Sequence, residues 1–251
     1  MLEQNNIYLG DCLDLMVDIP DKSIDMILCD LPYGTTSCKW DSIIPFAPLW
    51  EQYNRVIKDR GAIVLTASQP FTSALVMSNI TKFKYQWIWA KSRKTGFANA
   101  NRQPLRNYED ILVFYNHQCI YNPQGLITLE APKEITRKKP ANDTVTAGEN
   151  DGSLCKTYIK KYTNYPSQIL SFSSEGNTVH PTQKPVALFE YLIKTYTNCG
   201  DTVLDNCIGS GTTAVACINT KRNFIGIEKE EKYYNIAKER INSIESKNNR
   251  T

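Results

Sequence analysis

The stretch VLDNCIGSGTTA, residues 203–214, has the pattern of a buried strand that leads through a glycine turn into a helix. Gly209 and Gly211 carry no side chain where the backbone must turn tightly and approach a ligand closely. Thr212 and Thr213 follow directly, where a hydroxyl can cap the start of the helix. The stretch therefore predicts an α/β fold with a ligand site at the turn. A purely structural turn is the alternative.

A strand candidate, NFIGIE, follows this helix at residues 223–228 and ends in an acid. The Glu228 carboxylate can accept hydrogen bonds from both hydroxyls of a ribose there, so the order of elements is typical of a nucleoside cofactor site. The segment GSGTTA also fits the dinucleotide pattern of nicotinamide oxidoreductases. Only 23 residues follow Glu228, however, so the rest of the sheet must come from the N-terminal part of the chain. That permuted order is not the usual dinucleotide arrangement.

Short apolar runs alternate with helical patterns along much of the chain. Strands are expected at residues 7–9, 24–30, 61–67, 83–90, 110–116, 201–206 and 223–228. Helices are expected at residues 13 to about 20, 50–57, 71–80, 186–197, 212–219 and 230–246. This alternation predicts a doubly wound α/β sheet with helices on both faces.

Between about residues 117 and 178 the alternation stops, and the sequence becomes rich in Asn, Thr, Lys, Pro and Gly. A long irregular stretch inside a compact domain is usually functional or disordered. We therefore expect a catalytic core from residues 1–90 and 179–251, with an inserted recognition region at residues 91–178. The first part of that region, to about residue 116, also fits the core sheet.

The middle of the chain is electropositive, although the net charge of the whole is only +3. Residues 60–108 hold eight cations and no acid, interleaved with Tyr85, Trp87, Trp89, Phe97 and Tyr108. This pattern suits a polyanion, because phosphates attract cations and bases stack on rings. A solvated basic face with its aromatic residues in the core is the alternative. The candidates for contacts with the polyanion are Lys91, Arg93, Lys94, Arg102, Arg106, Arg137, Lys138 and Lys139.

Other features of composition exclude several classes of protein. The eight cysteines form no C-x-x-C pair and there are only two histidines, so we expect reduced cysteines and no metal site. No basic start precedes an apolar stretch at the N-terminus, and no run of about 18 apolar residues occurs. We therefore expect a soluble, intracellular protein.

The segment CDLPYGTT, residues 29–36, stands at the end of the apolar strand candidate. Carboxyl ends of strands border the ligand crevice of an open α/β sheet, so Asp30, Pro32 and Tyr33 should face it. Attack by an aromatic amine on a methyl sulfonium needs such a set. The Asp30 carboxylate and the Leu31 carbonyl would accept from the amine and stabilise its growing positive charge, and Tyr33 would stack on a flipped base. A local turn with a packed tyrosine is the alternative.

Two weaker signals accompany these motifs. Asp11, in LGDC at residues 9–12, could accept from the adenine amino group of a cofactor or simply cap the next helix. His180 and Lys184 belong to HPTQKP, residues 180–185, which precedes a helix. Both side chains could touch the cofactor, and a packed histidine is the alternative.

Taken together, DLPYG, HPTQKP, LDNCIGSGTT and FIGIE resemble the motifs of the DNA amino-methyltransferases, in the order of their β group. The resemblance covers about residues 7–115 and 179–242. It implies a seven-stranded Rossmann-like methyltransferase sheet, S-adenosylmethionine as cofactor, double-stranded DNA as substrate and base flipping. By this resemblance the catalytic residues are Asp30, Leu31, Pro32 and Tyr33. The cofactor-binding residues are Asp11, Cys12, Asp30, His180, Lys184, Asp205, Cys207, Gly209, Ser210, Gly211, Thr212, Thr213 and Glu228.

The sequence departs from the family pattern in two places. Leu31 stands where the commonest form has proline, which matters little because this position contributes its carbonyl. Asp205, Asn206 and Cys207 replace the usual Asp-Pro-Phe, so an aromatic wall is missing and cofactor affinity is in question.

The resemblance implies a site-specific methyltransferase acting on N6 of adenine. Family members that act on N4 of cytosine more often begin the catalytic motif with Ser, so Asp30 favours adenine. An N4-cytosine enzyme and a catalytically silent DNA-binding relative are the alternatives. A bacterial or phage-encoded cytoplasmic protein is implied, while a homodimer and a cognate restriction endonuclease are left open.

Overall fold

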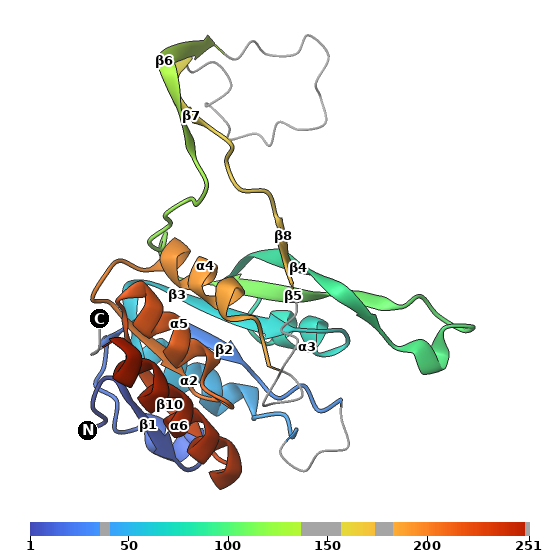
Figure 1. Cartoon of the computed structure of the whole chain (residues 1–251), viewed down its shortest axis with the longest axis vertical. Helices are drawn as coiled ribbons and strands as arrows, with labels where there is room; N and C mark the ends of the chain where they lie inside the picture. The colour runs from blue at the N-terminus through green and yellow to red at the C-terminus, as the bar shows by residue number, and fades with distance from the viewer. Residues whose placement is uncertain (36–40, 137–156, 174–182, 249–251) are drawn as a thin grey trace. The chain divides into compact units, whose positions relative to one another are not determined.

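The computed structural model describes residues 1–35, 41–136, 157–173 and 183–248. The chain divides into two compact units, one of Met1–Asn122 with Gln168–Thr251 and the other of Pro123–Ser167. The first unit is built on an eight-stranded sheet (Figure 1). Its strands are β1 (Asn6–Leu9), β2 (Ile24–Asp30), β3 (Ile57–Ala67), β4 (Phe83–Thr95), β5 (Arg106–Phe114), β8 (Ile169–Phe172), β9 (Thr202–Asp205) and β10 (Asn223–Glu228).

The strand order is β1-β10-β9-β2-β3-β5-β4-β8. The strands from β1 to β3 in this order run parallel, whereas β5 is antiparallel to both β3 and β4. The apolar run of β2 explains its central position, because five of its seven side chains are fully buried. A parallel strand covered on both faces needs such a continuous run. The last strands of the chain therefore lie between β1 and β2.

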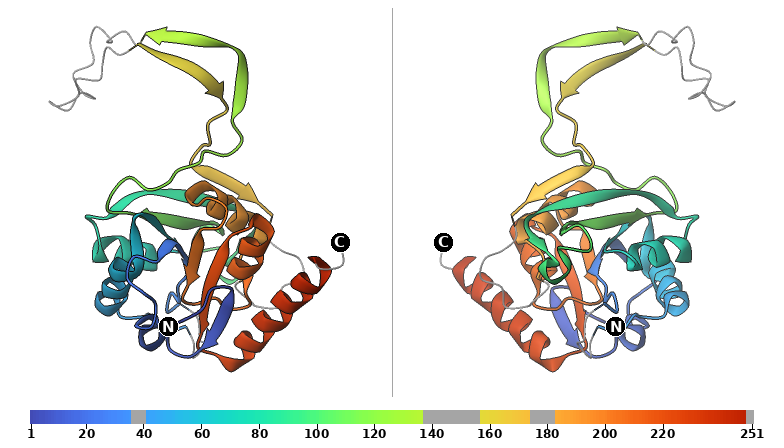
Figure 2. Two further views of the ribbon diagram at one scale, coloured as in Figure 1. Left: turned by 90° about the vertical axis from the view of Figure 1, so that its left-hand side faces the viewer. Right: turned by 90° about the vertical axis from the view of Figure 1, so that its right-hand side faces the viewer.

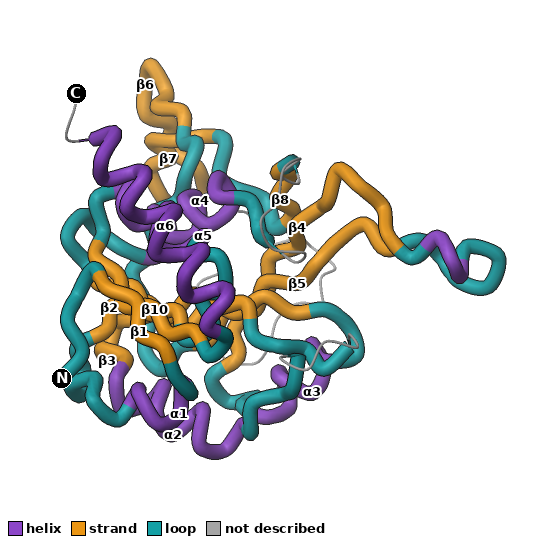
Figure 3. The backbone as a smooth tube through the Cα atoms, turned by 60° about the horizontal axis from the view of Figure 1, so that its bottom comes forward, coloured by secondary structure: helices purple, strands orange, loops and turns teal. Residues whose placement is uncertain are grey.

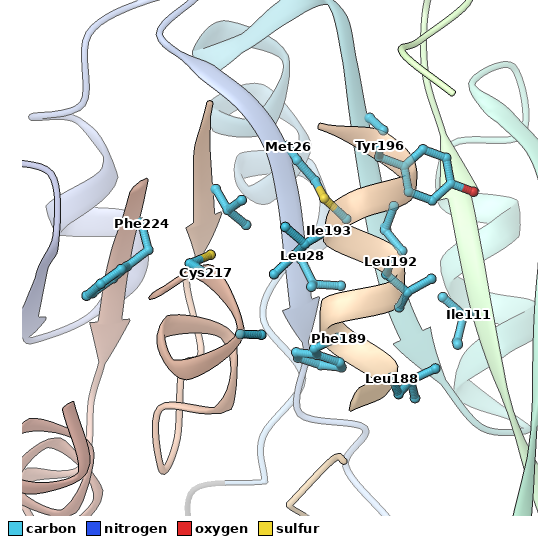
Figure 4. Close-up of a cluster of buried hydrophobic side chains, with 14 of the residues drawn as sticks. Met26, Leu28, Ile111, Leu188, Phe189, Leu192, Ile193, Tyr196, Cys217 and Phe224 are labelled. Atoms are coloured by element: carbon cyan, nitrogen blue, oxygen red, sulfur yellow. The ribbon is translucent and has the colours of Figure 1, made fainter. Parts of the chain in front are cut away.

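Helices cover both faces of this sheet (Figure 2). Two clusters of buried apolar side chains mark the two faces, one beneath the first three helices and one beneath the last three. Figure 4 shows the second cluster, which includes Leu188, Phe189 and Leu192 together with Met26 and Leu28. The helices are α1 (Cys12–Met16), α2 (Phe46–Val56), α3 (Phe71–Ser78), α4 (Val186–Tyr196), α5 (Thr212–Thr220) and α6 (Glu231–Asn248).

The doubly wound α/β fold expected from the sequence is thus confirmed, with one correction. The main sheet has eight strands instead of seven, because β8 pairs with β4 at the edge. The main sheet also includes residues 91–95 of β4 and residues 106–114 of β5. These two strands continue as a hairpin that projects from the unit and carries the short helix η1 (Phe97–Asn99) at its tip (Figure 3).

The second unit contains an antiparallel pair, β6 (Ile127–Thr136) and β7 (Thr157–Thr163). Nearly all side chains of both strands are exposed or half-buried. No face of this pair is buried, so the short alternation of apolar and polar residues at the start of β6 does not mark a strand that faces the core. The expectation of an irregular stretch is wrong for these residues.

In the part of the chain that the structure describes, no helix combines the length and the apolar character needed to cross a membrane.

Candidate active site

A cavity of about 410 Å³ opens at the carboxyl ends of β1, β2, β9 and β10. The motifs predicted from the sequence meet in its wall, although they lie far apart along the chain. The candidates that line it are Asp11, Cys12, Asp30, Leu31, Pro32, Tyr33, Lys184, Asp205, Cys207, Gly209, Ser210, Thr212, Thr213 and Glu228. His180 lies outside the described residues.

The glycine turn places two glycines in left-handed backbone, with φ of 54° at Gly209 and 84° at Gly211. A side chain at Gly211 would put its Cβ 3.1 Å from that of Ala237, so this residue allows α6 to approach. The space around Gly209 is open, and its N–H points to the Glu228 carboxylate. Gly209 therefore serves the cavity wall, whereas Gly211 serves the packing behind it.

The expectation that Thr212 or Thr213 caps α5 is wrong. The N-cap is Gly211, and no side chain caps the helix. The Thr213 hydroxyl instead donates to Oδ2 of Asp205, while Thr212 accepts from Arg240 at 3.3 Å. Both threonines thus tie the glycine turn to its surroundings.

Asp205 is a buried acid at the end of β9, with 3% of its surface exposed. Its Oδ1 accepts from the backbone N–H of Cys207 at 3.1 Å, and its Oδ2 accepts from Thr213. Burial raises the pKa of Asp205 to about 7, because its hydrogen bonds only partly offset the loss of solvent. This carboxyl holds the turn in shape from behind.

Glu228 is nearly buried at the end of β10, and both of its oxygens accept backbone hydrogen bonds. The N–H of Gly209 donates to Oε2 and the N–H of Glu230 donates to Oε1, each at 2.8 Å. Burial raises the pKa of Glu228, and these hydrogen bonds oppose the shift. The acid therefore links the glycine turn to β10 while it faces the cavity.

Asp11 caps α1, since its Oδ1 accepts from the N–H of Leu13 at 3.0 Å. Its Oδ2 lies 3.0 Å from Nζ of Lys229 and is partly exposed, so a contact with a cofactor is also compatible with the geometry. Cys12 and Cys207 line the cavity beside it and are hydrogen-bonded to each other. That hydrogen bond and burial raise the pKa of Cys12, so small neutral thiols form this wall where an aromatic ring is missing.

The Asp30 carboxylate is held on both oxygens. Its Oδ1 accepts from the Tyr33 hydroxyl at 2.8 Å and from the Thr66 hydroxyl, which comes from the neighbouring strand β3. Its Oδ2 accepts from Nζ of Lys184 at 2.5 Å. The Tyr33 ring stacks on Phe71, with centroids 5.2 Å apart and planes at 24°. Aspartate and tyrosine are therefore fixed as one rigid group.

Sequence reasoning missed a buried charge network behind Asp30. Lys184 is only 5% exposed and lies 3.3 Å from Oε2 of Glu109, which also pairs through Oε1 with Lys91. Burial alone would lower the pKa of Lys184, but the charges of Asp30 and Glu109 outweigh it and raise that pKa. The only signal in the sequence is the pair of acids, Glu109 and Asp110, that precedes the apolar run of β5.

The basic segment divides between core and surface. Trp87 and Trp89 are buried, so the core alternative holds for them, whereas Phe97 and Tyr108 are exposed. Lys91 is a half-buried ion-pair partner of Glu109 instead of an unpaired surface cation. The exposed cations of the β4–β5 hairpin are Arg93, Lys94, Arg102 and Arg106. Arg137, Lys138 and Lys139 lie outside the described residues.

The fold is that of the α/β methyltransferases that use S-adenosylmethionine. The model of the DNA methylase family matches residues 24–239, so the chain belongs to the DNA methylases of the N6-adenine and N4-cytosine type.

Known proteins agree with this placement. The chain is 29% identical to the type II methyltransferase M1.MboII of Moraxella bovis, over 98% of this chain and 99% of that protein. It is 27% identical to the type II methyltransferase M.BglII of Bacillus subtilis, over 98% and 71%. The M1.HpyAVI complex with S-adenosylmethionine is 26% identical with a TM-score of 0.62, covering 94% of this chain and 98% of that one. The cytosine-N4-specific PvuII methyltransferase shares the fold, with a TM-score of 0.65, 17% identity, and coverage of 94% and 86%.

Proposed function

We propose that this DNA methyltransferase transfers the methyl group of S-adenosylmethionine to the exocyclic N6 of an adenine flipped out of duplex DNA. The Asp30 carboxylate in the cavity wall carries this proposal. Its Oδ1 is occupied by two hydroxyl donors, whereas Oδ2 accepts one hydrogen bond from Lys184. A carboxylate oxygen has about two acceptor positions, so Oδ2 retains one for the amine of a base.

S-adenosylmethionine supplies, when bound, a methyl group on a positively charged sulfur. The amine of adenine is a poor nucleophile because its lone pair is delocalised into the ring. Oδ2 of Asp30 and the Leu31 carbonyl would accept from its two N–H groups and localise that lone pair. Both acceptors would also stabilise the positive charge that grows on nitrogen as the new C–N bond forms and the S–C bond breaks. The nitrogen then gives up one proton, toward Oδ2 of Asp30.

Two groups of residues hold the donor in this proposal. Glu228 accepts from the ribose hydroxyls, and Asp11 accepts from the adenine amino group of the cofactor. The glycine turn, from Asp205 to Thr213, surrounds the methionine end. The cavity suits a nucleoside cofactor because Asp11 and Glu228 both line it, together with the glycine turn.

The target base reaches the cavity only after leaving the DNA stack. We assign the contact with the flipped base to Tyr33, beside Asp30 in the cavity wall. The β4–β5 hairpin borders the same cavity through Thr95, Arg106 and Tyr108 and bears exposed cations, so it would follow the phosphate backbone. The unit Pro123–Ser167 is the proposed recognition element.

The choice of adenine over cytosine depends on Asp30, since cytosine enzymes of the family more often have Ser in its place. The type II relatives support a site-specific enzyme of a restriction and modification system, with a cognate endonuclease as a proposed partner.

Mass spectrometry of nucleosides tests the proposal directly. Unmethylated genomic DNA is incubated with the protein and S-adenosylmethionine, with a no-cofactor control and with Asp30→Asn. N6-methyladenine that requires both cofactor and Asp30 supports the proposal. Formation of N4-methylcytosine would show that the target base is cytosine instead of adenine. If neither methylated base forms on DNA of varied sequence, although calorimetry shows that the cofactor binds, the proposal is overturned.

A further inference from the structure

Four charges of alternating sign run through the wall of the cavity, from Lys91 through Glu109 and Lys184 to Asp30. They come from three strands and from the segment before α4, so no local pattern brings them together. The Glu109 side chain is 12% exposed and that of Lys184 is 5% exposed. Of these four residues, Asp30 is the one to which the proposed function assigns a direct role in methyl transfer.

Stability alone does not account for this arrangement. Taking a charge out of water costs several kcal/mol, and apolar residues of similar size often stabilise a protein equally well or better in place of buried ion pairs. Glu109 nevertheless lies in the cavity wall with a lysine at each oxygen. We therefore look for a role of the network in the chemistry at the cavity.

Charge balance is one such role. Positive charge moves onto the target nitrogen during methyl transfer, directly beside Oδ2 of Asp30. An uncompensated Lys184 ammonium at 2.5 Å from the same oxygen would oppose that movement. Glu109, which Lys184 shares with Lys91, offsets part of the charge of Lys184, so the negative charge of Asp30 stays more effective toward the nitrogen.

Anchoring is a second role. A lysine side chain is a flexible four-carbon stem with a compact charge, so one contact does not fix its ammonium group. Contacts with both Asp30 and Glu109 hold Nζ between two carboxylates. Oδ2 of Asp30 is thereby fixed by Lys184, as Oδ1 is fixed by the Tyr33 and Thr66 hydroxyls. Small misplacements at a reacting centre can lower a rate about a hundredfold.

We propose that Glu109 is a positioning residue for methyl transfer, which acts through Lys184 on the Asp30 carboxylate. This inference rests on the proposed function.

Single-turnover methylation rates of variants test the inference. Glu109→Gln should lower the rate by about tenfold to a hundredfold, while the Kd for S-adenosylmethionine stays within about threefold of wild type. Glu109→Asp keeps the charge and should be faster than Glu109→Gln. Lys184→Met should also be slow, and the double variant Glu109→Gln with Lys184→Met should be no slower than Lys184→Met alone. Once the ammonium group is removed, Glu109 has no route to Asp30.

Asp25→Asn is the matched control. The Asp25 side chain is also 12% exposed and ion-paired, to Lys58 at 2.7 Å, but it lies at the other end of β2 from Asp30. This control should lower the melting temperature and leave the rate within about twofold of wild type. All rates are measured well below each melting temperature and per cofactor-binding site, so a loss of folded protein does not count as a loss of rate.

Three results would overturn the inference. One is a Glu109→Gln rate within about twofold of wild type. Another is a Glu109→Asp rate no higher than that of Glu109→Gln. The third is a double variant whose loss is the product of the two single losses. Failure of the proposed function gives a different result, since wild-type protein would then form no methylated adenine at all.

Discussion

The Tyr33 hydroxyl lies 2.8 Å from Oδ1 of Asp30 and 3.0 Å from the hydroxyl oxygen of Thr66. The aromatic residue of the catalytic motif is thus bound to the acid of the same motif, in addition to forming a cavity wall. Burial and the charge of Asp30 raise the pKa of Tyr33 well above its ordinary value, so the hydroxyl remains a donor at neutral pH.

Removal of this hydroxyl should slow methyl transfer without loss of cofactor binding. Hydrogen bonds to charged groups contribute about 1.5–3 kcal/mol, so Tyr33→Phe should lower the single-turnover rate by about tenfold or more. Tyr33→Ala also loses the ring and should be slower still. Tyr85→Phe is the control, because it removes a hydroxyl that contacts Tyr196 instead of a cavity residue. Equal rates for wild type and Tyr33→Phe would mean that Thr66 and Lys184 alone orient Asp30.

The exposed cations of the β4–β5 hairpin should account for part of the salt dependence of DNA binding. Changing Arg93, Lys94 and Arg102 to Gln should raise the Kd for duplex DNA. It should also reduce the slope of log Kd against log salt by up to about 2.7, since each phosphate contact contributes about 0.9. Lys58, Arg60 and Lys84, also exposed, lie at the other ends of their strands and form the control set. If both triple variants keep the wild-type slope, the hairpin does not contact phosphates.

Glu228→Gln should weaken binding of S-adenosylmethionine. Both carboxylate oxygens accept from backbone N–H groups, so the amide would turn its own NH₂ toward either Gly209 or Glu230. The neutral amide also offers the ribose hydroxyls of the proposed cofactor no charged acceptor. A hydrogen bond to a charged group contributes about 1.5–3 kcal/mol, so its loss corresponds to a rise in Kd of about tenfold or more. Calorimetric titration measures this, with Glu190→Gln on α4 as a control away from the cavity. An unchanged Kd would remove Glu228 from the cofactor site.

Asp205 should make stability fall as pH rises. Its folded pKa of about 7 lies above the ordinary value of 3.8, so between about pH 4 and pH 7 the folded state holds a proton that the unfolded state has lost. The stabilisation from that proton is present at low pH and is lost as pH rises through 7, at up to about 1.4 kcal/mol per pH unit. Asp205→Asn lacks this titration.

Urea unfolding of both proteins at several values between pH 5 and pH 8 measures the effect. The free energy of unfolding of wild type minus that of Asp205→Asn should decrease from pH 5 to about pH 7 and level off by pH 8. A difference that stays constant with pH would show that Asp205 remains ionised in the folded protein.

The sequence was sufficient for the core elements because buried parallel strands are continuous apolar runs, as in β2, and each is followed by a helical pattern. It was insufficient where a strand has no buried face, as in β6 and β7, or only pairs at an edge, as in β8. The charge network could not be predicted for another reason. Whether Glu109 meets Lys184 depends on which strands become neighbours and on the path of the chain before α4.

The glycine turn and the catalytic motif differ in how much the sequence revealed. The placement of Asp30 and Glu228 at carboxyl ends of strands follows from their positions after apolar runs. The hydrogen-bond partner of Thr213 cannot be predicted in this way, because a threonine after a glycine turn can either cap the helix or donate to an acid that precedes it in the chain. The packed structure shows that the Thr213 hydroxyl donates to Asp205 and does not cap the helix.

The pairing of β1 with β10 and of β2 with β9 also determines when the cavity can exist. During synthesis Asp30 leaves the ribosome early, whereas the glycine turn and Glu228 emerge only near the end of this sequence. A nascent chain holds Asp30 long before it holds the strands that complete the cavity. The proposed donor site therefore forms only once the chain has been translated past β10, and a polypeptide arrested before β9 would lack the strands that complete this cavity.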